Sequence, residues 1–407
     1  MIERYDFVII GNSAAGLQAL RTLRKHDRES SVAILDREDR PAYSRVLTPY
    51  YVGGHIPRER LDIVEHSFYE ELGVVTLFGQ AVVEFDPERH LVMLADGRTL
   101  GFGKLLLAIG AEARTLTLRT PRACVLRHME DAERLVELYR GAKTITAIGA
   151  GLVSLPLLSH APAGAEKHLV VGSDRIFSRV VDPAASAILE EDLIAKGLQI
   201  HKQNDIDELA GVDQLQLKLK CGKEITSDLL IIGKGVTPNI QLAANVGLDV
   251  DDGILVDEQC RTSHPDVFAA GDAAEGADFI SGLKTIQGNW MTAVEQGENA
   301  ALNMLGLKVR YEGSLKNNIT EIFGIDVAAV GYCSDDAPQT HYSWTPATGR
   351  FRKVFLDERQ RVIGATMIGE TNDSGLYYQL VRTRSPFPGG LWLNKTASYA
   401  HVQCLAA

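Results

Sequence analysis

Cysteine is scarce in this sequence: the 407 residues contain five, and no two of them form a C-x-x-C pair. Zinc and iron–sulfur sites gather cysteines at short spacing, so no such motif is visible locally. Isolated thiols are typical of a protein kept in a reducing compartment. We therefore expect no metal site, and buried or surface thiols at Cys124, Cys221, Cys260, Cys333 and Cys404.

Long apolar runs and excess positive charge are also missing. No run reaches the length of a membrane span, and no apolar signal region precedes the first predicted strand. Acidic residues outnumber basic ones by 53 to 42, so nucleic acid and anionic membranes are poor partners. The length and the 45% hydrophobic content are ordinary for a soluble α/β protein of two or three domains. We expect a cytoplasmic location.

The most informative stretch is a glycine-containing turn near the N-terminus. Residues 7–10 are apolar and predict a short buried strand, and a helical pattern follows the turn through Arg24. Gly11 turns the chain, and Gly16 lets the helix pack close to the strand. The first amides of such a helix have no intrahelical partner and can bind a pyrophosphate, helped by the helix dipole.

A second strand and an acid follow at the spacing of a dinucleotide-binding unit. Residues 32–35 predict the strand, and Asp36 at its end would hydrogen-bond the ribose hydroxyls of an adenosine. The motif departs from G-x-G-x-x-G at its second glycine, which is Ser13. The alternative is an ordinary βαβ unit with a tight turn and no ligand.

The next segments continue this unit. Residues 41–54 are rich in turn formers and aromatics and predict a surface loop, or a segment folded over a cofactor with Arg45 near its phosphates or ring. Residues 74–77 predict a third parallel strand, and residues 80–86 and 91–94 predict a small antiparallel excursion. A buried strand then ends in Gly110, where backbone could approach a ligand closely.

A second unit repeats the pattern. Residues 144–154 again form a strand and a glycine turn, residues 168–171 predict the second strand, and residues 229–233 predict a buried one. Residues 183–196 predict an amphipathic helix with Leu189, Leu193 and Ile194 on one face. Two dinucleotide-type units in one chain are far more specific than one.

The chain then returns to the first unit. Residues 267–272 predict a short buried strand that delivers Asp272, and residues 285–305 predict a helix that carries Trp290. From about residue 310 the pattern changes to short alternating strands, which predict a third, α+β domain. The tail after Pro386, with Trp392 and Tyr399, would pack on a neighbouring subunit or cap its own domain.

With these residues, the chain resembles the FAD-dependent pyridine nucleotide–disulfide oxidoreductase family. It is most similar to the cysteine-free branch, which contains the rubredoxin reductases and the flavin portion of NADH-dependent nitrite reductases. The resemblance implies that FAD contacts Gly11, Ser13, Ala14, Ala15, Gly16, Asp36, Arg37, Arg45, Val82, Ala108, Gly110, Gly271, Asp272 and Trp290. It further implies that NAD(H) or NADP(H) contacts Gly149, Gly151 and Gly235.

The sequence departs from the family pattern in two places. The redox-active cysteine pair is missing, and the position used by single-cysteine members of the family falls near Arg45 or Val46, so no thiol there can take electrons from a flavin. In the second motif the third glycine is Ser154, and the acid usually found two residues later is Pro156. Gly172 stands where the ribose acid belongs, which predicts loose and unselective nicotinamide binding.

We therefore expect an α/β fold with two interleaved dinucleotide-binding (Rossmann-like) domains and a C-terminal α+β interface domain. The predicted FAD-binding domain comprises residues 1–115 and 240–308, the NAD(P)-binding-like domain residues 116–239, and the interface domain residues 309–407.

The resemblance implies a FAD-dependent oxidoreductase that transfers electrons between NAD(P)H and a protein redox partner. That partner would be a rubredoxin, a ferredoxin, or an iron–sulfur, molybdenum or tungsten enzyme subunit, with the chain working as an oligomer or in a hetero-complex. The alternative is a FAD-binding electron-transfer or scaffold subunit with a degenerate nicotinamide site. The direction of electron flow stays open, and no catalytic residue is assigned.

Overall fold

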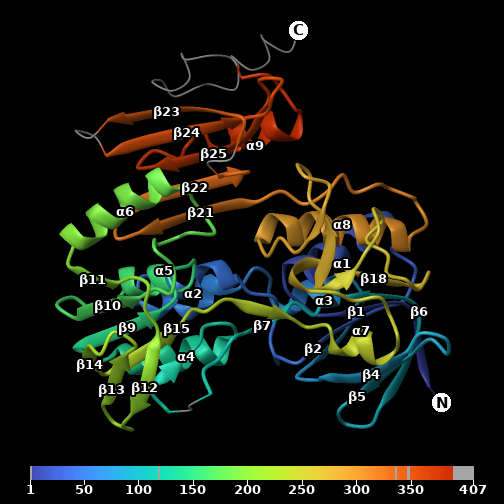
Figure 1. Cartoon of the computed structure of the whole chain (residues 1–407). Helices are drawn as coiled ribbons and strands as arrows, with labels where there is room; N and C mark the ends of the chain where they lie inside the picture. Colours follow the sequence, from blue (N-terminus) through green and yellow to red (C-terminus); the bar gives the residue numbers. More distant parts are fainter. Residues whose placement is uncertain (1, 118–119, 335–336, 346–348, 388–407) are drawn as a thin grey trace. The chain divides into compact units, whose positions relative to one another are not determined.

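The computed structural model describes residues 2–117, 120–334, 337–345 and 349–387 (Figure 1). Its contacts divide the chain into two compact units. The chain enters the first unit, leaves it and returns to it, as interleaved domains require. The domain boundaries given above remain a prediction. The first unit comprises Met1–Ser44, Arg58–Glu112 and Thr237–Leu315, and the second comprises Arg45–Pro57, Ala113–Val236 and Lys316–Ala407.

The described part of the first unit is built on a seven-stranded sheet of order β3-β2-β1-β6-β5-β4, with β18 paired to β6. β1, β2, β3, β6 and β18 pair in parallel. β5 runs antiparallel to both β4 and β6, so the predicted antiparallel excursion extends the main sheet. The strands are β1 (Glu3–Ile10), β2 (Val32–Asp36), β3 (Val75–Phe78), β4 (Val82–Asp86), β5 (Leu91–Leu94), β6 (Thr99–Leu107) and β18 (Val267–Ala269).

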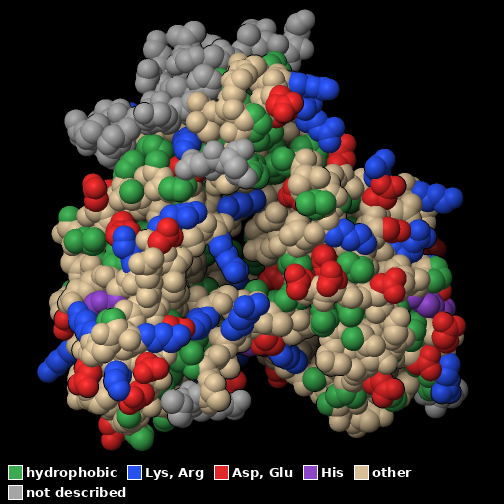
Figure 2. Space-filling model, in the orientation of Figure 1, with side chains coloured by type: hydrophobic (Ala, Val, Ile, Leu, Met, Phe, Trp, Pro, Cys, Tyr) green, Lys and Arg blue, Asp and Glu red, His purple; other side chains and the backbone are tan. Residues whose placement is uncertain are grey.

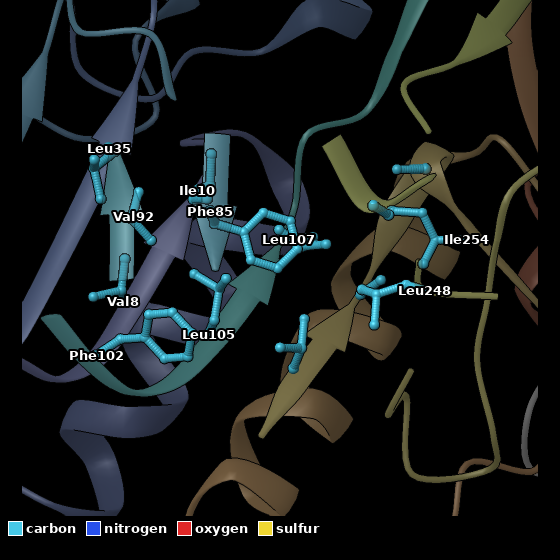
Figure 3. Packing of buried hydrophobic residues seen from close by; sticks show 14 of the residues in the cluster. Val8, Ile10, Leu35, Phe85, Val92, Phe102, Leu105, Leu107, Leu248 and Ile254 are labelled. Atoms are coloured by element: carbon cyan, nitrogen blue, oxygen red, sulfur yellow. The ribbon is translucent and has the colours of Figure 1, made fainter. Parts of the chain in front are cut away.

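Strand β1 shows why this sheet needs cover on both faces. Val8 and Ile10 point into one buried cluster, with Leu105 and Leu107 of β6 (Figure 3). Phe7 and Ile9 lie in a second cluster with residues of α1 (Ala14–His26) and α8 (Trp290–Met304). Alternate residues of a strand face opposite sides, so a continuous apolar run is what a doubly covered parallel strand requires.

Helices α1 and α8 cross at very short range. A Cβ on Gly297 of α8 would lie 2.2 Å from the carbonyl oxygen of Ala15 in α1, so only glycine permits the approach. Asn289 caps α8 by accepting a hydrogen bond from the Thr292 amide at 2.9 Å. The smaller elements of this unit are η2 (Arg58–Leu61), α3 (His66–Glu71), α7 (Gln241–Asn245), β17 (Ile254–Leu255), η3 (Gly271–Ala273), β19 (Ala274–Ala277) and β20 (Lys284–Thr285).

The second unit contains a parallel sheet of order β11-β10-β9-β15-β8 and a separate antiparallel sheet of order β12-β13-β14. Its sheet strands are β8 (Ala123–Cys124), β9 (Thr144–Ile148), β10 (Glu166–Val170), β11 (Leu198–His201), β12 (Ile206–Ala210), β13 (Leu215–Leu219), β14 (Glu224–Ser227) and β15 (Leu229–Ile232). Its helices include η1 (Arg45–Leu47), α2 (Thr48–Val52), α4 (Met129–Tyr139), α5 (Ser154–Ser159) and α6 (Pro183–Ala195). β7 (Ala111–Ala113) pairs with β16 (Val236–Pro238).

A five-stranded antiparallel sheet of order β21-β22-β25-β24-β23 completes the described part of this unit. β24 and β25 are buried along nearly their whole length, rather than on one face as alternating strands would be. α6 and α9 (Ser374–Arg382) both pack against β25, which explains this burial. The strands are β21 (Asn317–Ile322), β22 (Ile325–Gly331), β23 (Gln339–Thr345), β24 (Arg350–Leu356) and β25 (Val362–Ile368).

Three local predictions were wrong in detail. The segment 41–54 is not only loop, because it contains η1 and α2. The helix predicted over 285–305 begins at Trp290, since Asn289 takes the capping role and the preceding residues are extended or irregular. Ile194 of α6 is 52% exposed, whereas Leu189 and Leu193 are buried as predicted. The predicted roles of Trp392 and Tyr399 lie outside the described residues.

No helix in the described residues is long and apolar enough to cross a bilayer. The same residues bring together no group of three or more His, Cys, Asp or Glu side chains able to hold a metal ion. The described cysteines Cys124, Cys221, Cys260 and Cys333 are all free thiols.

Two histidines on neighbouring strands of the second unit form a stacked pair. His168 Nδ1 of β10 lies 3.2 Å from His201 Nε2 of β11. Burial lowers the pKa of His168, and burial together with the nearby Lys223 and His168 lowers the pKa of His201 to about 4. The folded protein therefore favours the neutral form of both rings.

This pair predicts a loss of stability in mild acid. The stability from His201 should be fully present above pH 6.5, its ordinary pKa, and should be lost as the pH falls toward about 4. We expect the free energy of unfolding to fall by about 1–2 kcal/mol more in the native chain than in His201→Gln between pH 7.5 and 5. Urea unfolding at the two pH values measures this. His26→Gln, at the exposed end of α1, is the control, and equal losses in native and His201→Gln protein would contradict the prediction.

Candidate functional site

The predicted turn after β1 is held by backbone contacts that only glycine allows. Gly11 has φ +108°, and its amide donates to the Leu35 carbonyl oxygen of β2 at 2.7 Å. A Cβ on Gly11 would lie 2.1 Å from the Ala108 carbonyl oxygen, and one on Gly16 would lie 1.8 Å from the Gly11 carbonyl oxygen. The turn therefore draws together the ends of β1, β2 and β6 and the start of α1.

The start of α1 presents backbone amides to the turn. Ser13 is the N-cap residue, and within the described residues its side chain makes no capping hydrogen bond. The first intrahelical bond runs from Leu17 N to Ser13 O at 2.8 Å, which leaves the amides of Ala14, Ala15 and Gly16 without an intrahelical partner. This arrangement suits the diphosphate of a dinucleotide.

Asp36 lies at the end of β2, beside this turn. Its Oδ2 accepts a hydrogen bond from the Asn12 amide at 2.7 Å, and its Oδ1 accepts one from the Glu38 amide at 2.8 Å. Both oxygens keep further lone pairs for ribose hydroxyls. The Asn12 side chain is buried and accepts a hydrogen bond from Tyr69 Oη at 2.9 Å, so the turn is fixed on the side of Asp36 as well.

The ends of β6 and β18 add the second group of predicted residues. Ala108 and Gly110 follow β6, and Asn239 donates from its side chain to Ile109 O at 2.8 Å and from its backbone to Gly110 O at 2.9 Å. Gly271, with φ +78°, donates its amide to Gln296 Oε1 of α8 at 2.8 Å, and Asp272 follows it half-buried. These ends adjoin the glycine turn, because β1, β2, β6 and β18 pair in parallel within one sheet.

The remaining residues predicted to contact FAD have varied surroundings. Trp290 is the first residue of α8 and packs partly buried against the cluster beneath it. Val82 is half-buried on β4, and Arg37 is exposed and pairs with Glu112. Arg45 belongs to the second unit, where its guanidinium donates to the carbonyl oxygen of Arg127, two residues before α4. A role for Arg45 at the flavin stays a prediction.

The first unit fits the FAD that the family resemblance implies. Glycines clear a backbone cradle at the strand ends, α1 offers unpaired amides to a diphosphate, and Asp36 offers a carboxylate to a ribose. Sequence reasoning gave no role to Asn12, Tyr69 or Gln296, whose side chains hydrogen-bond within this region. Asn12 lies inside the glycine motif and Gln296 on the predicted helix, so only Tyr69 carried no signal.

The second unit repeats two backbone contacts of the first turn. The Gly149 amide donates to Val170 O at 2.8 Å, and a Cβ on Gly149 would lie 2.2 Å from the Gly233 carbonyl oxygen. Ser154, in place of the third glycine, is buried and faces Gly233, the residue that follows β15. A Cβ on Gly233 would lie 2.0 Å from Ser154 Oγ. The serine is therefore a compensated replacement and does not disrupt the turn.

The other departures are also tolerated structurally. Pro156 is the third residue of α5, and the amides on either side of it, of Leu155 and Leu157, still donate to Gly151 O and Val153 O at 3.2 Å. Gly172 is exposed two residues after β10, and a Cβ there would meet only Asn204 O, at 3.9 Å. Gly151 and Gly235 have open space at the Cβ position. The unit keeps its turn but offers no carboxylate at the position of the ribose acid.

Among the described thiols, three are held in the protonated form. Burial raises the pKa of Cys124, Cys260 and Cys333, whereas backbone hydrogen bonding lowers the pKa of the exposed Cys221. Cys221 lies after β13, in the turn toward β14.

These positions predict that no thiol carries electrons. A variant with all five cysteines replaced by alanine or serine should bind FAD and be reduced at a rate within about twofold of the native chain, because the buried thiols are unreactive. Rapid-mixing absorbance of the flavin band measures the rate. Cys404 lies outside the described residues, so Cys404→Ser is made separately, and loss of reduction in it would contradict the prediction.

Asp36 gives a direct test of the FAD site. Asp36→Ala removes the acceptor for the ribose and two backbone hydrogen bonds, and should weaken FAD binding by about 2–3 kcal/mol, or roughly 30- to 150-fold. Titration of FAD into apoprotein, followed by flavin fluorescence, measures the affinity. Asp96→Ala in the same unit removes an exposed carboxylate and should bind FAD normally. Unchanged affinity in Asp36→Ala would contradict the assignment.

Comparison with known proteins gives the same family. The model for "Pyridine nucleotide-disulphide oxidoreductase" matches residues 5–297, more than half of the chain. The 3-phenylpropionate/cinnamic acid dioxygenase ferredoxin–NAD(+) reductase component of Photorhabdus laumondii is 31% identical, over 91% of this chain and 94% of that protein. The assimilatory nitrate reductase electron transfer subunit of Bacillus subtilis is 27% identical over 91% of this chain, which spans 48% of that longer protein.

A solved structure supports the fold. The covalent putidaredoxin reductase–putidaredoxin complex contains a chain that matches with a TM-score of 0.91 at 23% identity, over 100% of this chain and 99% of that one. The α/β fold with Rossmann-like domains is therefore confirmed. The chain belongs to the pyridine nucleotide-disulphide oxidoreductase family.

Proposed function

We propose that this chain is a FAD-dependent oxidoreductase that passes electrons between NAD(P)H and an iron–sulfur or rubredoxin-type protein. The observation that carries the proposal is the pair of matching glycine turns, at Gly11 and Gly149, in a chain without a cysteine pair. A ferredoxin–NAD(+) reductase component is among its relatives, which supports a protein as the electron partner.

The residues of the first unit would bind and orient FAD. The amides of Ala14, Ala15 and Gly16 suit its diphosphate, Asp36 its adenosine ribose, and Asp272 its ribityl chain. Trp290 and the N-terminal end of α8 would shield one side of the flavin and place a helix dipole toward it. When bound, FAD accepts a hydride as an electron pair and releases electrons singly, which suits a junction between a nicotinamide and a one-electron protein.

The partner's docking surface is not set by overall charge. On the face in Figure 2, basic and acidic side chains are interspersed over the described residues of each unit. A net charge of −11 therefore influences encounter rates more than it selects a docking patch. We also propose a cytoplasmic location, which the free thiols favour, and the three-domain division predicted from the sequence.

A second candidate is a FAD-binding electron-transfer or scaffold subunit with a degenerate nicotinamide site. It is favoured by the uncharged Gly172 and by the relation to a part of the longer Bacillus subtilis electron transfer subunit. Electrons would then arrive from a partner protein and not from NAD(P)H.

An anaerobic spectrum of the purified chain separates these candidates. Bleaching of the flavin band by NADH or NADPH, followed by recovery on adding oxidised ferredoxin or rubredoxin, supports the oxidoreductase. Bleaching only by a reduced protein donor supports the subunit. Rapid oxygen consumption with NADH and no transfer to either protein would show an oxidase and overturn the first proposal.

Gly172 predicts how the nicotinamide is selected. Gly172→Glu has room for its side chain and should favour NADH over NADPH by about 1–3 kcal/mol, or roughly 5- to 150-fold, because a carboxylate accepts the 2′-hydroxyl and repels a 2′-phosphate. Flavin reduction against cofactor concentration measures the preference. Gly172→Gln is the neutral control. If both variants match the native chain, the ribose lies elsewhere or is not bound.

A further inference from the structure

The segment 172–182 links β10 to α6 and begins at the ribose position of the second unit. Phe177 at its centre is buried with φ +50°, a conformation that a bulky residue seldom adopts. Its amide donates to Ala150 O at 3.1 Å, inside the glycine turn. The segment therefore folds back on the turn in a strained conformation, which surrounding contacts must hold.

Two lysines supply those contacts from the C-terminal part of the unit. Lys316, just before β21, donates from Nζ to Arg179 O at 2.7 Å and to Val180 O at 2.8 Å. Lys353 of β24 lies with Nζ 3.3 Å from Oδ1 of the fully buried Asp182. That same oxygen accepts the Ala184 amide at 3.1 Å and caps α6. Both ends of the 179–182 stretch are thus tied to one sheet.

The backbone of Lys316 is also fixed. The carbonyl oxygen of Lys316 accepts a hydrogen bond from the Gly331 amide at 2.8 Å, which joins Lys316 to the end of β22. Burial lowers the pKa of the Lys316 ammonium. The carbonyl oxygens of Arg179 and Val180 replace the water that burial removes from this ammonium. The same sheet reaches the helix after the glycine turn, since the Phe323 amide donates to Ser159 Oγ at 2.6 Å. The sheet therefore contacts both elements that would hold the nucleotide.

We infer that Lys316 is a positioning residue for the nicotinamide nucleotide: it holds the 172–182 segment against the Gly149 turn from the C-terminal sheet. The inference rests on the proposed nicotinamide role of the second unit. With no acid at Gly172 to anchor a ribose, nucleotide affinity depends on how firmly this segment is held. The C-terminal sheet is then part of the nicotinamide site.

The test uses the full-length, FAD-loaded chain and Lys316→Met, which removes the ammonium but keeps most of the side-chain volume. We expect the KM for NADH and the Kd for ADP-ribose to rise about tenfold. The limiting rate of flavin reduction should stay within about twofold and the FAD content should not change, because Lys316 affects nucleotide binding alone. Stopped-flow reduction and calorimetric titration measure these quantities.

Lys218→Met is the matched control, because it removes an exposed lysine of the same unit whose partner is Glu208. If Lys316→Met folds poorly, Lys316→Gln removes the charge and retains a polar group for the same comparison. A lowered Tm with unchanged KM and Kd would mean a structural role only and would overturn the inference. If the wild-type protein binds neither NADH nor ADP-ribose, the proposed nicotinamide role is wrong and this inference falls with it. If NADH reduces the wild type and Lys316→Met with the same KM, only this inference is wrong.

Discussion

The fold depends on one contact that occurs twice. In each case a backbone carbonyl oxygen packs against the Cα of a glycine, in the space that a Cβ would need. At Gly11 this oxygen belongs to Ala108, and at Gly149 it belongs to Gly233. Each contact draws the first strand of a unit against its neighbour and aims the next helix at the strand ends. A methyl group at either glycine would push the strand ends apart and remove the cradle for a dinucleotide.

The two turns share their backbone contacts but differ in the side chains around them. In the first unit, Asp36 supplies a carboxylate that two backbone amides hold in place. In the second unit, Ser154 is accommodated because Gly233 faces it. The position that corresponds to Asp36 is Gly172, which carries no charge. The second unit therefore keeps the architecture of a dinucleotide unit without a carboxylate at the position of the ribose acid.

Both parallel sheets and the glycine turns could be predicted from local pattern. Runs such as residues 7–10 and 229–232 are apolar without alternation, and only strands covered on both faces suit them. Residues 41–54 were harder, because prolines and aromatics suggest a loop while η1 and α2 form there. β24 and β25 were expected to alternate, but both are buried along nearly their whole length, and in β24 the charged Arg352 and Lys353 are buried with carboxylate partners.

By itself, the sequence determined the two strand–turn–helix motifs, Asp36 at the end of its strand, the loss of the cysteine pair and the family to which these features belong. These are local properties, since glycine sterics and strand periodicity act over a few residues. The tertiary structure decided what supports them: Tyr69 behind Asn12, Gln296 beneath Gly271 and Lys316 on the carbonyls of Arg179 and Val180. Those partners are tens of residues or more apart in the chain, and only the packing of sheets and helices brings them within hydrogen-bond distance.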